Sequence, residues 1–136
     1  MAIKQAATRR ARLYNGTHGN TAKEVFKVTL AADAAGTEIE MGIIPAGLEV
    51  TDLAIVTDNL GAGTNVDVGY RYVDPDNGSD DPDYWGNYTT AAAAKKNSSA
   101  KPVRFEDEVI LVATLIGGEC SGELIVMPEA VTRGTK

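Results

Sequence analysis

Apolar and polar residues alternate along several short stretches of the chain, and clusters of turn residues separate them. In 24–30, for example, Phe26, Val28 and Leu30 share one face. Such alternation is typical of strands with one buried face, and a short run that is apolar on both faces is typical of a central strand. Stretches of one kind or the other occur at 24–30, 38–43, 48–57, 66–72, 102–105, 109–116 and 122–127. The pattern predicts an all-β fold of about eight strands.

The segment 42–72 carries three of these strands with short turns between them. Pro45-Ala46-Gly47 forms one turn, and Asn59-Leu60-Gly61-Ala62-Gly63 the other. Strands joined by such short turns are expected to be neighbours in one antiparallel sheet. Within 48–57 the apolar positions change phase near Thr51-Asp52, which predicts a β-bulge or a strand that crosses between sheets.

A long excursion interrupts the strand pattern at about 74–101. It begins with an acidic, turn-rich loop at 74–83 and continues into an aromatic cluster. The segment 89–96 is rich in alanine and lysine, which favours one or two helical turns. We expect a jelly-roll-like antiparallel β-sandwich at 21–136 that contains this excursion, preceded by a basic arm at 1–20. An open barrel with a helical insert is the alternative.

Charge is distributed unevenly along the 136 residues. The formal net charge is −6, yet the first 23 residues hold five basic residues and no acidic one. The body is therefore strongly acidic and repels phosphate, so no direct role with nucleic acid is expected. Residues 1–12 are predicted to be extended and mobile, since termini fray unless something ties them down. After them, Asn15-Gly16 predicts a tight turn.

The composition also limits the compartment. A single cysteine excludes a disulfide within the chain. No apolar run is long enough to span a membrane, and the N-terminus lacks the apolar core of a signal peptide. These features predict folding in a reducing cytoplasm and no membrane partner.

The residues that could carry chemistry are few. His18 is the single histidine and Cys120 the single cysteine, and no G-x-S-x-G sequence is present. One histidine cannot build a zinc site of two or three histidines. The acidic loop 74–83 could supply oxygen ligands to calcium, but Gly78 lies one position too early for the helical calcium loop. We therefore predict no enzymatic activity, no cofactor and no metal, and expect a solvated loop at 74–83.

Two groups of residues are candidates for binding a partner. The first is the basic arm, which carries Lys4, Arg9, Arg10 and Arg12. A basic arm on an acidic body can contact the surface of another protein, although most charged runs are simply solvated. The second group is Tyr84, Trp85 and Tyr88. Aromatic residues in a polar segment often anchor an interface, and they equally often cap the end of a sandwich.

Three stretches carry a family resemblance. They are 30–39 followed by Ile44-Pro45-Ala46-Gly47, then Val66-Asp67-Val68-Gly69-Tyr70 leading to Asp83-Tyr84-Trp85, and finally the hairpin at 111–128. On these residues the chain resembles the small capsid decoration (head-stabilising) proteins of tailed bacteriophages.

The resemblance implies a jelly-roll-like body, made in the host cytoplasm and located on the capsid surface of the virion. It implies binding to the major capsid protein and self-association as a homo-oligomer, most often a trimer, without catalysis. Alternative hypotheses are another phage head or tail subunit, or a carbohydrate-binding module that uses Tyr84, Trp85 and Tyr88 as a stacking platform. An enzyme is the least supported class.

Overall fold

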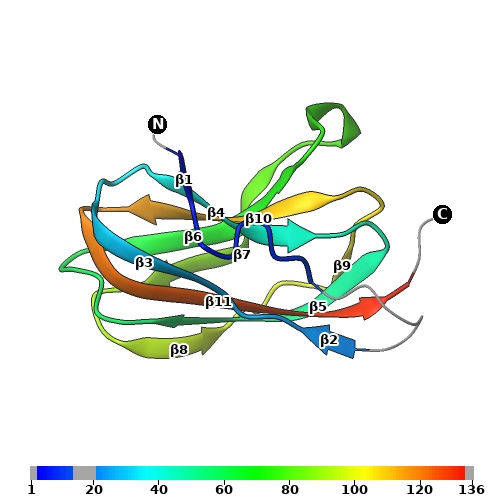
Figure 1. Ribbon diagram of the computed structural model, residues 1–136. Helices are drawn as coiled ribbons and strands as arrows, with labels where there is room; N and C mark the ends of the chain where they lie inside the picture. The colour runs from blue at the N-terminus through cyan, green and yellow to red at the C-terminus, as the bar shows by residue number, and fades with distance from the viewer. Residues whose placement is uncertain (1–2, 14–20, 134–136) are drawn as a thin grey trace.

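Two β-sheets pack face to face in the computed structural model, which describes residues 3–13 and 21–133 (Figure 1). Among these residues the only helical element is the short 3-10 turn η1 (Pro75–Asn77). The strands are β1 (Ile3–Gln5), β2 (Thr21–Lys23), β3 (Phe26–Asp33), β4 (Glu38–Ile44), β5 (Leu48–Thr57), β6 (Asn65–Tyr72), β7 (Asp81–Thr89), β8 (Ala94–Asn97), β9 (Val103–Arg104), β10 (Val109–Ile116) and β11 (Cys120–Thr132).

The strand order is that of a jelly roll. Sheet A has the order β1-β4-β10-β6-β7. Sheet B has the order β2-β11-β5-β8, with β3 also paired to β11 and β9 also paired to β5. If the short strands β1, β2 and β9 are set aside, two four-stranded sheets remain, and each strand lies in the opposite sheet from the one before it except within the β6–β7 hairpin, as in the two Greek keys of a jelly roll. The predicted antiparallel sandwich is confirmed, and β1 adds one parallel pairing with β4.

The segment 42–72 departs from its predicted pairing. Its three strands, β4, β5 and β6, lie in sheet A, sheet B and sheet A in turn, so none of them pairs with the next. The expectation that they form one antiparallel unit was wrong, because the two connections cross the sandwich instead of folding back within a sheet. A hydrophobic pattern shows that a strand has a buried face but does not show which neighbour it pairs with.

The phase change near Thr51 is a β-bulge. Asp52 pairs with Glu129 and Val50 with Ala130, which leaves Thr51 as the extra residue on β5. The bulge keeps Val50 and Leu53 both inside the core although they are three positions apart. Of the two structures that the phase change allowed, the bulge is therefore confirmed.

Strand β11 runs through Pro128, although the sequence suggested that the strand would stop there. The Pro128 carbonyl accepts from the N–H of Glu24, at the point where the neighbour of β11 changes from β3 to β2. Pro128 lies between the last residue of β11 that pairs with β3 and the first that pairs with β2. Its missing N–H therefore falls in the gap between these two strands, and no strand hydrogen bond is lost.

The excursion 74–101 is also part of the sandwich. Strand β7 pairs with β6, and Ala94–Asn97 pairs with β5 as strand β8, where the sequence suggested a helical turn. The edge position beside β5 decides the conformation of this short segment, because helix propensity is too weak to hold a four-residue helix alone.

The core fills the space between the two sheets. Fully buried side chains from both sheets meet there, among them Phe26, Leu53 and Leu111, together with Phe105 from the segment after β9. Gly42 allows one close contact, because a Cβ atom at this position would lie 2.6 Å from the ring of Phe26. The Phe26 ring on β3 therefore lies directly against the backbone of β4, and this contact joins the two sheets.

Candidate interaction surfaces

The basic arm lies on the body, against the edge of sheet A. Ile3–Gln5 pairs in parallel with Glu38 to Glu40, and Ala6 and Leu13 are buried. Farther along, the N–H of Ile43 donates to the Ala11 carbonyl. The described part of the arm is therefore a structural element, and the expectation that residues 1–12 form a mobile extension was wrong for this part. Residues 14–20, with the predicted Asn15-Gly16 turn and His18, lie outside the described residues.

Thr8 joins the arm to both sheets. Its hydroxyl donates to the Met41 carbonyl on β4 at 2.7 Å and accepts from the N–H of Lys27 on β3 at 3.1 Å. Beside it, Lys4 donates to Asp33 at 2.7 Å. The arm thus closes the open side of the sandwich between β3 and β4, and it covers edge groups that would otherwise be free to pair with another chain.

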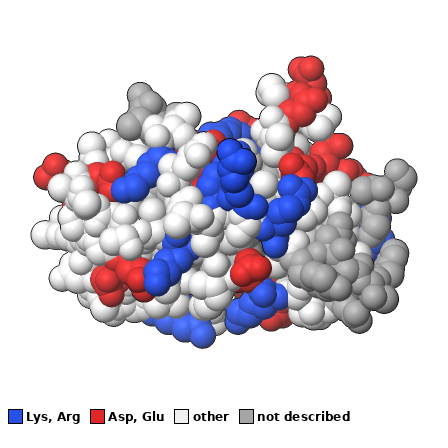
Figure 2. Space-filling model, viewed as in Figure 1, with Lys and Arg blue, Asp and Glu red and all other residues white. Residues whose placement is uncertain are grey.

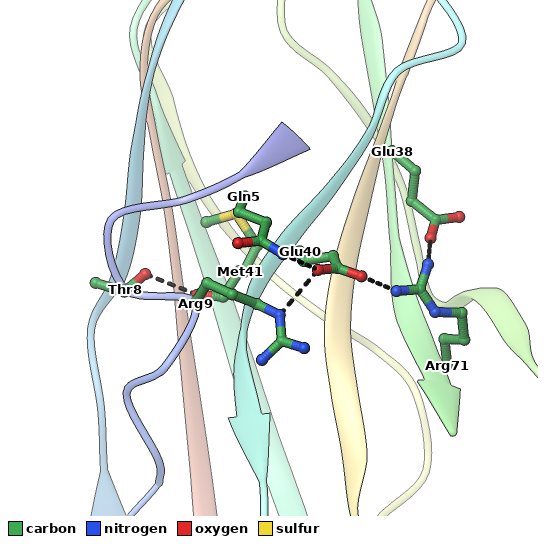
Figure 3. A network of polar contacts seen from close by, with 7 residues as sticks. All are labelled: Gln5, Thr8, Arg9, Glu38, Glu40, Met41 and Arg71. Carbon is green, nitrogen blue, oxygen red and sulfur yellow. Dashed lines mark hydrogen bonds and ion pairs between the residues drawn. The ribbon is translucent and has the colours of Figure 1, made fainter. Parts of the chain in front are cut away.

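A buried polar network fixes the arm to sheet A (Figure 3). Glu40 is only 6% exposed and accepts hydrogen bonds from Gln5, Arg9 and Arg71, with the Arg9 contact at 2.9 Å. Arg71 also binds Glu38. Two guanidinium groups and one amide therefore surround a carboxylate that has little contact with water. A buried carboxylate requires this degree of pairing, because an unpaired buried charge is strongly destabilising.

The ion pairs neutralise most of the arm's charge. Lys4, Arg9 and Arg12 pair with Asp33, Glu40 and Glu108 of the body. Burial acts to raise the pKa of Asp33, but the hydrogen bonds from Lys4 and from the Ala31 N–H outweigh it and hold this pKa below its usual value. Arg10 is exposed and makes no ion pair within the described part of the chain.

The aromatic cluster caps one end of the sandwich. Trp85 is 3% exposed and Tyr88 is 9% exposed. The ring of Trp85 lies 5.5 Å from Tyr84 and 6.3 Å from Phe105, centre to centre. The Tyr84 hydroxyl donates to the Lys101 carbonyl at 2.8 Å. These side chains serve the core, so the buried Trp85 ring is not available as a stacking platform for a sugar.

The acidic loop forms the tip of the β6–β7 hairpin, which stands away from the body (Figure 1). Residues 73–80 are all exposed, and Val73 is 48% exposed. Asp74 caps η1 by accepting from the Asp76 N–H at 2.9 Å, and Asp80 accepts from the Tyr72 N–H at 3.0 Å. The tip is therefore ordered by its own carboxylates. Within the described residues, no three His, Cys, Asp or Glu side chains gather to hold a metal ion.

The groups needed for catalysis are not gathered in the described part of the chain. Cys120 is buried, and burial raises the pKa of its thiol, which disfavours the reactive thiolate. A groove of about 370 Å³ between the arm and β3 is lined by Lys4, Gln5, Ala7, Thr8, Lys27, Val28 and Thr29, none of which forms a nucleophile–base pair.

The described helical element is too short to cross a membrane.

Sheet B presents an outer face with apolar residues between lysines. Lys27, Ile125, Val56 and Lys95 are paired in sequence across β3, β11, β5 and β8. Directly paired residues point to the same side of a sheet, and the neighbouring Val126 and Ile55 are buried, so this row faces outward. We call it the lysine-flanked row. Nothing in the linear sequence indicates it, because its four members come from four distant segments.

On the face drawn in Figure 2, acidic side chains gather on the projecting β6–β7 hairpin, whereas acidic and basic side chains are interspersed over the rest of the body. Lysine or arginine side chains lie along the arm and on the lower rim near β8. Sequence reasoning found the arm and the acidic loop as charged segments. It missed Glu38, Glu40 and Arg71, because alternation in a strand places such residues in solvent and gives no sign that an arm covers them.

Solved structures share this fold. A chain from the capsid of Ralstonia phage GP4 superposes with a TM-score of 0.76 at 19% identity, over 99% of this chain and 100% of that one. A chain from the acid-stable capsid of Helicobacter pylori bacteriophage KHP30 has a TM-score of 0.64 at 15% identity, over 87% and 92% of the two chains. A chain from the capsid of cyanophage Pam1 gives 0.57 at 16% identity, over 93% and 94%.

These likenesses establish the fold as one also found in phage capsids. No protein-family model matches the chain, and no curated protein matches it in sequence.

Proposed function

We propose that this chain is a structural protein of a bacteriophage virion that binds the outer surface of the assembled capsid and stabilises it. The observation that carries the proposal is the match to a chain of the Ralstonia phage GP4 capsid over nearly the full length of both chains. Two further phage capsids contain the same fold. The likeness to the GP4 chain extends over 99% of this chain and 100% of that one.

The physical character of the chain supports a role without chemistry. A decoration protein needs a rigid body, a contact surface and many copies. The jelly roll supplies the rigid body, since two sheets, an aromatic cap and a docked arm hold its edges. Binding only to the assembled shell stabilises that shell by mass action, and bridging several subunits strengthens weak individual contacts. The net charge of −6 favours solubility of a particle that carries many copies.

We propose the outward face of the arm as one contact with the shell protein. Arg10 is exposed, and the side chain of Arg12 is 52% exposed despite its pair with Glu108. Because the arm is fixed to β4, it presents these cations without the entropy cost of ordering a free segment. Lys4 and Arg9 would act indirectly, by holding the arm in place. In this proposal the buried Trp85 and Tyr88 support the fold and do not touch the partner.

The test is binding to heads that were assembled without this chain. Purified protein is added, and the number of bound copies is measured by gel densitometry and located by electron microscopy. We expect saturable binding on the outside of the shell and greater DNA retention on heating. Absence of binding to any head form would overturn the proposal. Localisation to the tail would instead favour the alternative of another virion subunit.

A matched pair of variants tests the arm. Arg10→Glu reverses an exposed charge that makes no ion pair with any described residue, and Lys101→Glu makes the same change at an exposed site beside β7, at the edge of sheet A away from the arm. We expect Arg10→Glu to lower head occupancy by about tenfold at low salt, and Lys101→Glu to leave it unchanged. Equal binding by both variants would remove the arm from the contact.

A further inference from the structure

The outer face of sheet B has the properties of a docking surface. In the lysine-flanked row, Lys27 and Lys95 are exposed, whereas Ile125 and Val56 between them are half-buried. A second row on the same face, Met127, Ala54 and Asn97, lies beside it and adds the half-buried Met127 side chain to the apolar strip. The two lysines are three strand spacings apart, roughly 14 Å. This is wide enough to receive a two-stranded hairpin between them.

The charges of this row are available to a partner. Lys95 makes no ion pair with any described residue. Lys27 pairs with Glu123 at 3.1 Å, but their side chains are 51% and 39% exposed. An exposed pair of this kind contributes little, so Lys27 can exchange Glu123 for another carboxylate at small cost. The row therefore favours an occupant with an apolar centre and acidic flanks.

The chain itself carries such a segment at the β6–β7 hairpin tip, residues 73–80. The tip combines the exposed Val73 with three aspartates, Asp74, Asp76 and Asp80, and it holds no basic residue. None of the three forms an ion pair within the described part of the chain, and the Asp76 side chain makes no hydrogen bond there. The tip is preformed, because the hydrogen bonds of Asp74 and Asp80 order it.

The two surfaces lie on opposite sides of the molecule. In Figure 1 the hairpin projects from the upper side, beyond sheet A, and β8 runs along the lower side in sheet B. The tip of one copy therefore cannot contact the lysine-flanked row of the same copy. A contact between tip and row must join two copies, and it is heterologous because it uses different surfaces on each. Such contacts close into rings when the rotation between copies permits.

We propose that the lysine-flanked row of one copy binds the β6–β7 hairpin tip of a second copy. Val73 lies against Ile125 and Val56, and the tip carboxylates lie beside Lys27 and Lys95. The contact area is small, so affinity in solution is weak and falls with salt, and it rises when copies are held close together. The inference concerns self-association and does not depend on capsid binding.

Carbodiimide coupling tests the contact in the free protein, because it joins only a lysine and a carboxylate that touch. A mixture of ¹⁴N- and ¹⁵N-labelled protein at low ionic strength identifies coupling between copies by mass spectrometry. We expect mixed-isotope products that join Lys95 or Lys27 to an aspartate of the tip, and their loss at high salt. A protein that stays monomeric in sedimentation and yields no such product at low salt would overturn the proposal.

Two charge reversals show whether the contact is heterologous. Lys95→Glu damages the row and leaves the tip intact, whereas Asp76→Lys damages the tip and leaves the row intact. Neither side chain has an ion pair among the described residues, so neither change should affect folding. Each variant alone should associate at least about tenfold more weakly than the wild type.

An equimolar mixture of the two variants should recover association, because the intact tip of Lys95→Glu meets the intact row of Asp76→Lys in one contact and the two reversed charges meet in the other. The double variant in a single chain should recover association. Lys101→Glu, which changes an exposed lysine outside the row, should behave as the wild type. Unaltered association of the two single variants, or a mixture that stays monomeric, would contradict the proposed contact.

Discussion

At the scale of the residue, Glu40 decides how the arm is held. Its carboxylate receives Arg9 and Gln5 from the arm and Arg71 from sheet A, so one buried group links three segments of the chain. Removing one partner from such a network costs more than the net energy of any single contact, because the remaining charges stay buried without compensation.

We expect Glu40→Gln to lower the free energy of unfolding by about 2–3 kcal/mol, since the amide turns a donor toward the two guanidinium groups. The matched control is Glu108→Gln, whose partner Arg12 has a side chain that is 52% exposed, and it should cost less than about 1 kcal/mol. Chemical denaturation of both variants measures the difference. Equal effects would mean that the buried network adds nothing to the stability of the arm.

Asp33 should make the Lys4 contact depend on pH. Its pKa is lowered in the folded protein, so the contact adds stability above the unfolded aspartate value of about 3.9 and loses it as pH falls through the folded pKa. Lys4→Met should therefore reduce stability by up to about 1 kcal/mol at pH 7 and have no effect near pH 2. Denaturation at both pH values measures this. If Lys4→Met lowers the free energy of unfolding equally at both pH values, Asp33 is not the group through which Lys4 stabilises the fold.

At the scale of the element, the arm acts as an edge strand. Its pairing with β4 and its Thr8 bridge to β3 cover one open side of the sandwich. The sequence signalled a basic, acid-free segment, and from that a mobile arm is the natural prediction. It could not show that Asp33, Glu40 and Glu108 lie where they neutralise Lys4, Arg9 and Arg12, because each pair joins residues that are distant in the sequence.

Deleting residues 1–12 should destabilise the protein by about 2–4 kcal/mol, at about 1 kcal/mol for each strand hydrogen bond lost. It should also increase aggregation, since β4 becomes an uncovered edge. Thermal unfolding and light scattering measure the two effects. Arg10→Ala is the control, because this exposed residue makes no ion pair with the part of the chain that the structure describes and should change stability by less than about 0.5 kcal/mol. Full stability after the deletion would show that the arm contributes nothing to the fold.

At the scale of the whole molecule, most strand pairs join segments that are distant in the sequence. Strand β3 pairs with β11 near the other end of the chain, and most of the long strands lie in the opposite sheet from the strand before them. The cost of closing long loops must be met before such pairs form, so folding should be slow for a chain of this size. The single tryptophan, Trp85, is buried and reports on core formation.

We expect stopped-flow refolding, followed by Trp85 fluorescence, to show a main phase in milliseconds to seconds at 25 °C. Circular dichroism at the same denaturant concentrations should give the same rate if the sheets and the core form together. Completion of the fluorescence change within microseconds would contradict the dominance of long-range pairing.

The sequence by itself determined the local properties: the positions of most strands, the phase change near Thr51, the lack of a motif for chemistry and the acidic character of the body. These follow from alternation, turn residues and composition, which act over a few residues. The tertiary structure alone decided which strands pair, that the arm is docked, that Trp85 is in the core, and that Lys27, Ile125, Val56 and Lys95 form one row. Each of these depends on contacts between distant segments, and a linear pattern specifies a buried face without specifying the neighbour that buries it.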